Sequence, residues 1–443
     1  MASTTKIIAV AIVVVIIAAA GYYWYYTTSQ PRTTEITLMT KAGLWADFIR
    51  NSGVLEDYKE RMLKEKNVKV EVTIITAPHR GYGEKLITSF AAGSEGDVCW
   101  VSPTDVFRLA ETEYLLDLTP YVSKWADWEK FYPAARNAYT IGGKVYAVPN
   151  DAATMVLYYR KDLFKKAGLP VPWQPETWDE VIEVALKLKE KFPDLPMIIE
   201  AWYEEQLPVY SDGGVIYDPS DGKFIAKSPQ LLYLFKLYYD IIYKYGLMPK
   251  EFKLEGWDDR KLFAEGKLPL MIDGTWCYTE KWGPNGPYPI ENREEVIGYA
   301  HPPSSGRPNN PHGKYPNTFR DYAWVISART KEPELAFELI KELTRADIMA
   351  KWGYETSHLI VRTDAMIGDY AKDKFLEWNT EALKYAVPKP TTTLFNKYMD
   401  ALKEVLRNEL LINGRTPEEC LEIFAEKVTE KLGEENVKEI PIP

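Results

Sequence analysis

Aromatic side chains are the most abundant groups in this chain of 443 residues that could contact a ligand directly. Trp, Tyr and Phe make up 13% of the chain, with 30 Tyr and 14 Trp. A hydrophobic core alone rarely needs so many, because Tyr and Trp carry a polar group as well as a ring. The composition therefore predicts surfaces that stack against a bound molecule.

Recognised catalytic and metal-binding patterns are missing from the sequence. The histidines show no HxxxH or HExxH spacing, the cysteines form no CxxC pair, and neither a GxxxxGK[ST] phosphate loop nor a GxSxG elbow occurs. The 64 acidic residues offer carboxylate pairs, but nothing singles out two of them for glycosidase chemistry. We therefore predict a protein that binds and does not catalyse, with no cofactor and no metal. The scattered residues are His79, His301, His312, His358, Cys99, Cys277 and Cys420.

Charge and composition narrow the class of protein further. The chain is 46% apolar and 27% charged, a globular balance, and its length predicts two or three domains. The net charge is −10 and the pI about 5.3. Binding to nucleic acid is driven largely by basic residues that displace counterions, so nucleic acid is not expected as a partner.

The N-terminal region contains an uncharged stretch, residues 7–26, that is separate from the globular part. As a helix it would span roughly 30 Å, which is one hydrocarbon core. We interpret residues 1–32 as a membrane anchor and tether that leaves the remainder outside the cell. The alternatives are a signal peptide cleaved near 18–20 and a pilin-like assembly helix. No lipobox cysteine follows, which excludes a bacterial lipoprotein anchor and suits an archaeal surface.

Hydrophobic periodicity predicts an α/β protein. Strands are expected at 35–40, 68–76 and 97–101, separated by helices at 48–66 and 82–92. This β-α-β-α-β order implies parallel strands joined by right-handed crossovers.

Later segments continue the α/β pattern. Strands at 144–149 and 154–160 follow one another so closely that they suggest one segment passing from one lobe to another. A capping box, Thr177-x-x-Glu180, opens a helix that runs to residue 191. Further strands are expected at 268–272 and 322–327, and the last hundred residues are mostly helical.

Six segments, in the same order, resemble motifs of the extracellular solute-binding proteins of ABC importers, in the maltose-binding-like group for sugars. They are GSEGDVCWV (93–101), LLDLTPY (115–121), GKVYAVP with LYYRKDLF (143–164), PETWDE (175–180), FAEGK with MIDGTW (263–276) and WVIS with PELAF (324–337). The resemblance covers about residues 35–430. The chain departs from the family in lacking the lipobox cysteine and in having Glu95-Gly96 where Pro usually precedes the Asp.

The resemblance implies a two-lobe periplasmic-binding-protein-like fold of type II, hinged by crossing strands, with the ligand held between the lobes. Lobe one would be 33–150 plus 303–349, and lobe two 151–302 plus 350–443. The implied partners are a carbohydrate ligand, the permease subunits with their cytoplasmic ATPase, and the membrane through the N-terminal helix.

Sugars present apolar C–H faces to aromatic rings and hydroxyl edges to carboxylates, amides and Arg. Ligands in α/β folds bind beyond the carboxyl ends of strands, so residues after strands are candidates. Trp276 follows the strand at 268–272, where the family places a stacking aromatic. Tyr203 lies at another family stacking position, and Trp202 precedes it.

Four further candidates each have a structural alternative. Trp45 lies in a glycine-containing loop after the first strand, and Trp100 in a strand where a core role is the alternative. Asp105 could accept sugar hydroxyls or merely begin the next helix. Asp151, at the crossing between lobes, contacts either the ligand or the hinge.

The last candidates come from the C-terminal third of the chain. Arg320 and Asp321 are expected in a loop, before the strand at 322–327, that the family directs at the cleft. Phe395 lies in the late helical region where the family often adds one more ring.

These features predict the substrate-binding component of an ABC transporter that captures a carbohydrate, expected to be an oligosaccharide. The rival in the same fold is a binder of a peptide, a polyamine or a phosphorylated polyol. Rivals from other classes are an extracellular glycan-degrading enzyme and a surface-filament protein.

Overall fold

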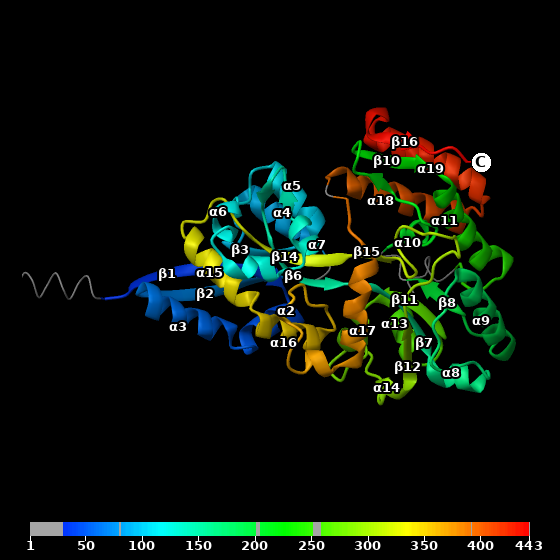
Figure 1. The fold of residues 1–443 in the computed structure, drawn as a ribbon, viewed down its shortest axis with the longest axis horizontal. Coiled ribbons are helices and arrows are strands. Elements are labelled where there is room, and N and C mark those ends of the chain that lie inside the picture. Colours follow the sequence, from blue (N-terminus) through cyan, green and yellow to red (C-terminus); the bar gives the residue numbers. More distant parts are fainter. Residues whose placement is uncertain (1–29, 79–80, 201–203, 251–257, 391, 443) are drawn as a thin grey trace, which may run out of the picture. The chain divides into compact units, whose positions relative to one another are not determined.

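The computed structural model describes residues 30–78, 81–200, 204–250, 258–390 and 392–442 (Figure 1). The chain divides into two compact units, which are taken separately below. Unit 1 comprises residues 1–100 and 326–343, and unit 2 comprises 101–325 and 344–443. These units are not the same division as the two predicted lobes, which are halves joined by a hinge. The predicted lobe boundaries stay a prediction.

The predicted anchor, residues 7–26, lies outside the described residues. Within the described ranges, every helix is too short or too polar to cross a bilayer. The same ranges contain no group of three or more His, Cys, Asp or Glu side chains arranged to hold a metal ion.

Unit 1 is built on a parallel sheet in the order β2-β1-β3. Ile36 and Leu38 of β1 are fully buried, which reflects the apolar alternation in the sequence. The register between β1 and β2 runs from Arg32 beside Val68 onward, so the predicted β-α-β-α-β order is confirmed. The elements of unit 1 are β1 (Arg32–Lys41), α2 (Leu44–Asn51), α3 (Val54–Lys66), β2 (Val68–Ala77), α4 (Tyr82–Ala92), β3 (Val98–Val101) and α15 (Pro333–Leu343).

The single helix predicted at 48–66 was wrong: α2 and α3 are separate helices. Gly53 has a φ of 87° between them, a left-handed conformation that glycine adopts at little cost. Apolar periodicity continues across the break, which is why the sequence pattern did not reveal it.

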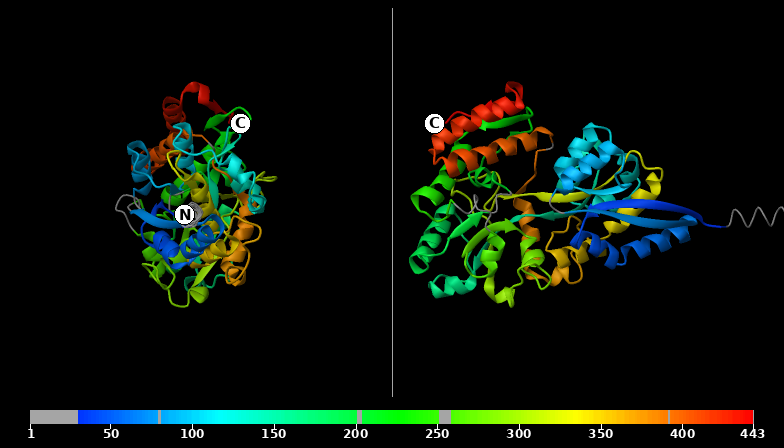
Figure 2. Two further views of the ribbon diagram at one scale, coloured as in Figure 1. Left: turned by 90° about the vertical axis from the view of Figure 1, so that its left-hand side faces the viewer. Right: turned by 180° about the vertical axis from the view of Figure 1, so that it is seen from behind.

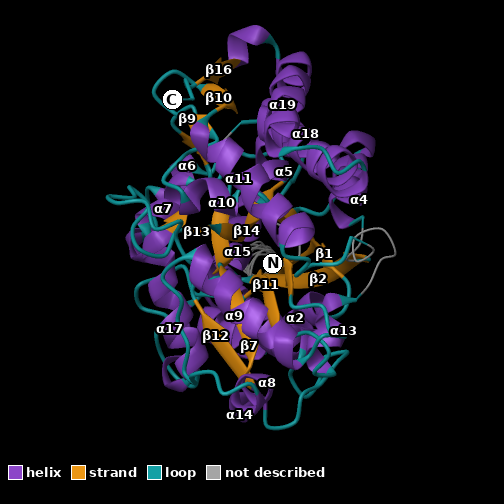
Figure 3. Ribbon diagram, turned by 90° about the vertical axis from the view of Figure 1, so that its right-hand side faces the viewer, coloured by secondary structure: helices purple, strands orange, loops and turns teal. Residues whose placement is uncertain are grey.

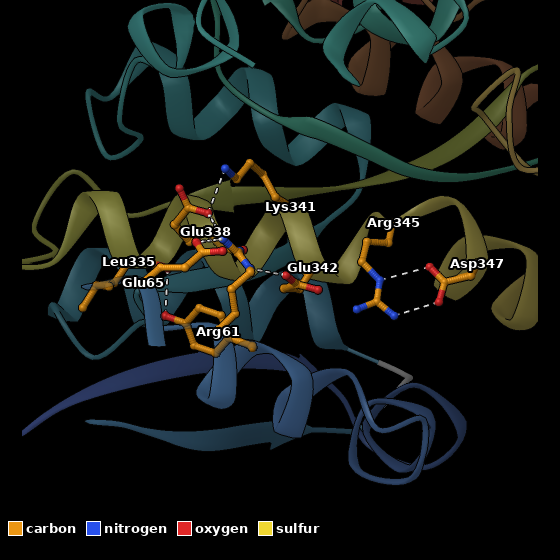
Figure 4. A network of polar contacts seen from close by, with 9 residues as sticks. Arg61, Glu65, Leu335, Glu338, Lys341, Glu342, Arg345 and Asp347 are labelled. Atoms are coloured by element: carbon orange, nitrogen blue, oxygen red, sulfur yellow. Dashed lines mark hydrogen bonds and ion pairs between the residues drawn. The ribbon is translucent and has the colours of Figure 1, made fainter. Parts of the chain in front are cut away.

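An ionic network joins α3 to α15 (Figure 4). The Arg61 guanidinium donates to Glu342 Oε1 at 2.5 Å and to Glu338 Oε2 at 2.7 Å. One turn earlier on α3, the Tyr58 hydroxyl donates to the Leu335 carbonyl at 2.9 Å. These contacts fix α15, which is remote in sequence, beside the N-terminal helices of unit 1.

Unit 2 contains several small sheets. The largest has the order β12-β7-β11-β8, with β7 antiparallel to both neighbours and β8 parallel to β11. Its elements up to residue 239 are α5 (Pro103–Glu111), α6 (Thr119–Val122), α7 (Pro133–Asn137), β4 (Thr140–Ile141), β5 (Lys144–Val145), β6 (Val148–Ala153), β7 (Met155–Arg160), α8 (Lys161–Lys166), α9 (Trp178–Lys191), β8 (Ile198–Glu200), α10 (Leu207–Ser211), β9 (Tyr217–Asp218), β10 (Lys223–Lys227) and α11 (Pro229–Tyr239).

The rest of unit 2 mixes strands and helices, and its last hundred residues are mostly helical, as predicted. Its elements are α13 (Asp259–Ala264), β11 (Leu270–Gly274), α14 (Arg293–Val296), β12 (Ile297–Ala300), β13 (Asn317–Thr318), β14 (Arg320–Ile326), α16 (Ala346–Thr356), α17 (Lys374–Ala382), β15 (Ala386–Val387), α18 (Leu394–Glu404), α19 (Pro417–Leu432) and β16 (Val437–Glu439). Figure 3 shows α18 and α19 side by side, and in Figure 2 the red C-terminal helix runs along the green strand β10.

The strands β6 and β7 are separated by Thr154 alone but belong to different sheets. β6 pairs antiparallel with β14, whereas β7 pairs with β11 and β12. The chain therefore passes from one sheet to another within a single extended run. The predicted passage of this run from one lobe to another stays a prediction.

Three local predictions need correction. Trp45, expected in a loop, lies in the first turn of α2, because the helix begins directly after Gly43. The predicted capping box is only half formed: the Thr177 hydroxyl accepts from the Glu180 amide, but the Glu180 carboxylate accepts from the Glu176 amide instead of that of Thr177. β14 begins at Arg320, so Arg320 and Asp321 lie in a strand and not in the loop before it. Pairing with Ala153 and Ala152 of β6 extends the strand to these polar residues.

Candidate functional site

Trp276 occupies the turn directly after β11 in unit 2. The strand ends at Gly274, two residues later than predicted, and the partly buried indole of Trp276 folds back onto it. A Cβ placed on Gly274 would lie 2.1 Å from Cη2 and Cζ3 and 2.4 Å from Cε3 of the indole. Gly274 is therefore required for this position of the ring.

The same distances show which part of the ring Gly274 covers. If the Cβ position on Gly274 lay beyond the edge of the ring, it would be much closer to one or two ring carbons than to the next. It is instead almost equally distant from three consecutive carbons, so it lies above the plane of the ring. The Gly274 backbone thus covers one face of the six-membered ring. Only the opposite face of that ring can stack against another group.

A cation already lies over the Trp276 ring. The Arg320 guanidinium carbon is 5.1 Å from the ring centroid, within the range of a cation–π interaction. The imidazole of His358 is also near, at 6.5 Å between ring centroids and 30° between planes, and it lies 5.5 Å from Trp352. Arg320 and His358 thus lie beside the predicted stacking residue, and Trp352 lies behind His358.

Glu204 links the aromatic groups through ion pairs. Its side chain is fully buried, and Oε1 lies 3.4 Å from the Arg320 guanidinium and 3.1 Å from the Lys389 ammonium. Oε2 accepts a hydrogen bond from the Gln206 amide at 2.6 Å. The Lys389 ammonium also lies 5.7 Å from the ring centroid of Phe395 on α18. A single carboxylate therefore holds two cations, each of which contacts an aromatic ring.

Strand geometry explains why these residues meet. β8 and β11 are parallel neighbours, with Ile272 beside Glu200, so their carboxyl ends lie at the same edge of the sheet. Glu204 follows β8 and Trp276 follows β11, as expected for a site beyond strand ends. The set comprising Glu204, Gln206, Trp276, Arg320, Lys389 and Phe395 is called the unit 2 cluster below.

Unit 1 holds a second aromatic cluster, around Lys41. The ammonium lies 4.3 Å from the centroid of Trp100, 4.9 Å from that of Trp45 and 5.9 Å from that of Tyr82. Lys41 is only 6% exposed and Trp100 1%. The Tyr82 hydroxyl donates to the backbone carbonyl of Trp100 at 2.7 Å, which orients the Tyr82 ring. These four residues, the Lys41 cage, form an aromatic box filled by the protein's own cation.

The two predicted aspartates have structural partners. Asp105 lies in the first turn of α5 and accepts a hydrogen bond from the Ser102 hydroxyl at 2.7 Å. Asp151 is buried, and its Oδ2 accepts from Asn150 at 2.7 Å and from the Trp352 indole at 2.6 Å. Both contacts fit the structural alternatives, and a role for either residue in ligand binding stays a prediction.

The remaining candidates divide between placed and unplaced residues. Of the predicted residues, Trp276, Arg320 and Phe395 are brought together in the unit 2 cluster, and Trp45 and Trp100 in the Lys41 cage. Trp202, Tyr203 and the side chain of Asp321 lie outside what the structure describes.

Sequence reasoning missed Glu204, Lys389 and Lys41. Lys41 is the last residue of β1 and Glu204 comes soon after β8, so the rule that selected aromatics after strands would also have selected them. Lys389 follows the two-residue strand β15, which is too short to leave a pattern in the sequence.

The unit 2 cluster combines the groups that bind an uncharged polar ring. Gln206 Oε1 is buried and has no hydrogen-bond partner within the described ranges, and the same holds for the hydroxyl of Thr275 beside Trp276. Buried polar atoms of this kind are normally satisfied by water or a ligand. The arrangement offers an aromatic face together with charged donors and acceptors.

Sequence comparison supports the same conclusion. A profile of the family described as "Bacterial extracellular solute-binding protein" matches residues 46–350. The galactooligosaccharide-binding protein of Bacillus subtilis is 26% identical over 86% of this chain and 87% of its own. A probable ABC transporter-binding protein of Deinococcus radiodurans is 26% identical over 65% of this chain and 68% of its own.

Structural comparison establishes the fold. The maltose-bound MalE3 of T. maritima superimposes with a TM-score of 0.72 and 23% identity, over 90% of this chain and all of the other. This similarity identifies a two-lobe α/β fold of the periplasmic-binding-protein type. Because the family profile spans more than half of the chain, the protein belongs to the bacterial extracellular solute-binding protein family.

Proposed function

We propose that the protein captures a carbohydrate, expected to be an oligosaccharide, for an ABC permease driven by a cytoplasmic ATPase. In this proposal the ligand lies between lobe one (33–150 plus 303–349) and lobe two (151–302 plus 350–443), which are hinged by the crossing strands. Ligand contacts with both lobes stabilise the closed state, so the affinity depends on the closing equilibrium.

The unit 2 cluster is the observation that carries this proposal. Trp276 offers one ring face, suited to the C–H face of a sugar, beside a buried carboxylate and amide suited to hydroxyl groups. A peptide or a polyamine would not require this pairing of a ring with hydroxyl acceptors. The relatives named for galactooligosaccharide and maltose point to the same ligand class.

Titration with a panel of maltose, maltotriose, mannotriose and galactooligosaccharides tests the proposal. Binding is measured by calorimetry and by the thermal shift of residues 33–443. A ligand at 100 times its Kd adds about 2.7 kcal/mol to the free energy of unfolding. Spermidine and a tetrapeptide serve as competing ligand classes. Binding of either of these, without binding of any saccharide, would contradict the proposal.

The protein is proposed to hold its ligand without covalent change, since its family consists of solute-binding proteins. Chromatography of a bound oligosaccharide after long incubation distinguishes this from glycan degradation. Recovery of the intact saccharide is expected, and the appearance of shorter products would support the enzyme alternative.

Residues 7–26 are proposed as a retained anchor that places the globular part outside the cell. Fractionation of cells that express the full chain tests this proposal. Membrane-bound protein of full mass is expected. A soluble product lacking the first twenty or so residues would support the cleaved signal peptide instead.

A further inference from the structure

The stacking face of Trp276 is covered in this structure by part of the protein itself. Gly274 covers one face of the six-membered ring, and the Arg320 guanidinium lies over the ring at 5.1 Å. A sugar that stacks on Trp276 needs the face that Gly274 leaves open. A stacked sugar and the Arg320 guanidinium would therefore compete for space over that face.

Arg320 has a second anchor point that holds it there. Its guanidinium lies 3.4 Å from the buried Glu204 carboxylate, and its side chain is 21% exposed, so solvent reaches part of it. An arginine has a long chain with several rotatable bonds, and its guanidinium carries several N–H donors. The guanidinium can therefore turn away from the ring while one of its nitrogen atoms stays paired with the carboxylate. The geometry therefore permits displacement from Trp276 without loss of Glu204 as a partner.

We propose that Arg320 is a competitor that sets the affinity for sugar: it occupies the Trp276 face in the unliganded protein and leaves when a saccharide stacks there. This inference rests on the proposed function. The apparent Kd of a ligand equals its intrinsic Kd divided by the fraction of protein in which the site is accessible. A cation–π contact over the indole would reduce the accessible fraction by a factor of about two to thirty.

Substitution distinguishes a competitor from an ordinary ligand contact, because the two roles change the affinity in opposite directions. Arg320→Ala is expected to lower the Kd for the tightest of the four saccharides by about twofold to thirtyfold. Lys389→Ala is the matched control, because Lys389 pairs with the same Glu204 oxygen but lies over Phe395 and not over Trp276. No decrease in Kd is expected for this control.

A spectroscopic readout tests the displacement directly. In the free protein, the guanidinium NMR signals of Arg320 should be shifted upfield by the indole ring current, and saturation with saccharide should abolish the shift. Arg320→Lys and Trp276→Phe assign the signal, and circular dichroism checks that each variant is folded.

The possible results separate the inference from the proposed function. Weaker saccharide binding by Arg320→Ala, or a guanidinium signal unchanged by saccharide, would overturn the competitor role alone. Equal tightening in Lys389→Ala would also overturn it, since the effect would then trace to Glu204. If no variant and no wild-type protein binds any of the four saccharides, the proposed function fails and this inference with it.

Discussion

Both units contain cations that lie over aromatic rings, but the two clusters differ in what they leave available to a ligand. In the Lys41 cage the cation is 6% exposed, three rings surround it, and Trp100 is part of the core. In the unit 2 cluster the cations Arg320 and Lys389 share a buried carboxylate, and the ring of Trp276 is only partly buried. The cage is a packed element of unit 1, whereas the unit 2 cluster keeps polar and aromatic groups that a ligand can use.

The comparison teaches that residue type alone does not identify a binding aromatic. Trp100 and Trp276 both lie at or after a strand, and both lie near a cation. Burial and the identity of the ionic partners separate them. The four predictions below test this difference, from the largest expected effect to the smallest.

Truncating Trp100 is expected to damage stability most. Trp100→Ala should lower the free energy of unfolding by about 3–5 kcal/mol, because a fully buried indole leaves a cavity. Urea denaturation measures the loss. The matched variant Trp276→Ala removes a partly buried indole and should cost less than half as much. Equal losses in the two variants would show that the clusters do not differ in this way.

Acid is expected to destabilise unit 2 through a buried histidine. All the described histidines belong to this unit, and burial lowers the pKa of His301, stacked 3.7 Å from Trp378, to about 4. The unfolded chain takes up this proton near pH 6.5, whereas the folded chain resists until about pH 4. The contribution of His301 to the free energy of unfolding is therefore fully present above pH 6.5. It falls as the pH drops, by about 2–3 kcal/mol at pH 4.5.

Urea denaturation at pH 7 and pH 4.5 checks the acid effect. Carboxylates titrate in the same range, so the difference between wild type and His301→Gln isolates the histidine. The variant should lose less stability on acidification than the wild type. Parallel losses in both proteins would remove His301 as the cause.

Truncating Trp276 is expected to affect ligand binding more than stability. If the proposed function is right, Trp276→Ala should weaken saccharide binding by at least about thirtyfold, or about 2 kcal/mol, because a stacked indole commonly dominates a binding site. Calorimetry measures the Kd. Trp45→Ala, in the Lys41 cage, should cause a smaller loss. The comparison fails if Trp45→Ala proves the more damaging of the two.

Removing the cation of the Lys41 cage is expected to have the smallest effect. Lys41→Met keeps most of the length of the side chain but removes the charge, and should lower the free energy of unfolding by about 1 kcal/mol, the usual size of a cation–π contact. Lys41→Arg retains a cation and should recover part of the loss. If Lys41→Met is as stable as the wild type, apolar packing alone holds the cage together.

Much of the fold was predictable because local patterns matched the final structure. The alternation in β1 and β2 and the order of elements in unit 1 fixed a parallel sheet, which the structure confirms. Local patterns failed where a non-local or single-residue effect intervened. Gly53 divides a helix within a continuous apolar pattern, and pairing with β6 extends β14 to Arg320.

The candidate site was predictable in its aromatic part only. Trp276 was found because it follows a strand in a motif that resembles a known family. Glu204 and Lys389 were missed. They are 185 residues apart, and nothing in the sequence indicates that this carboxylate and this ammonium will pair. Such pairing depends on the positions of β8 and β15, because Glu204 follows β8 and Lys389 follows β15. The pairing of these strands in their sheets sets those positions.

The sequence by itself determined the class of this protein: an α/β chain with many aromatics, no catalytic motif and ordered segments typical of solute-binding proteins. Hydrophobic periodicity and residue type carry this information because both act locally along the chain. Only the tertiary structure decided which rings are core and which stay accessible, since burial depends on residues far away in sequence. It also placed a backbone glycine on one face of Trp276 and an arginine over its ring, which no spacing along the chain could reveal.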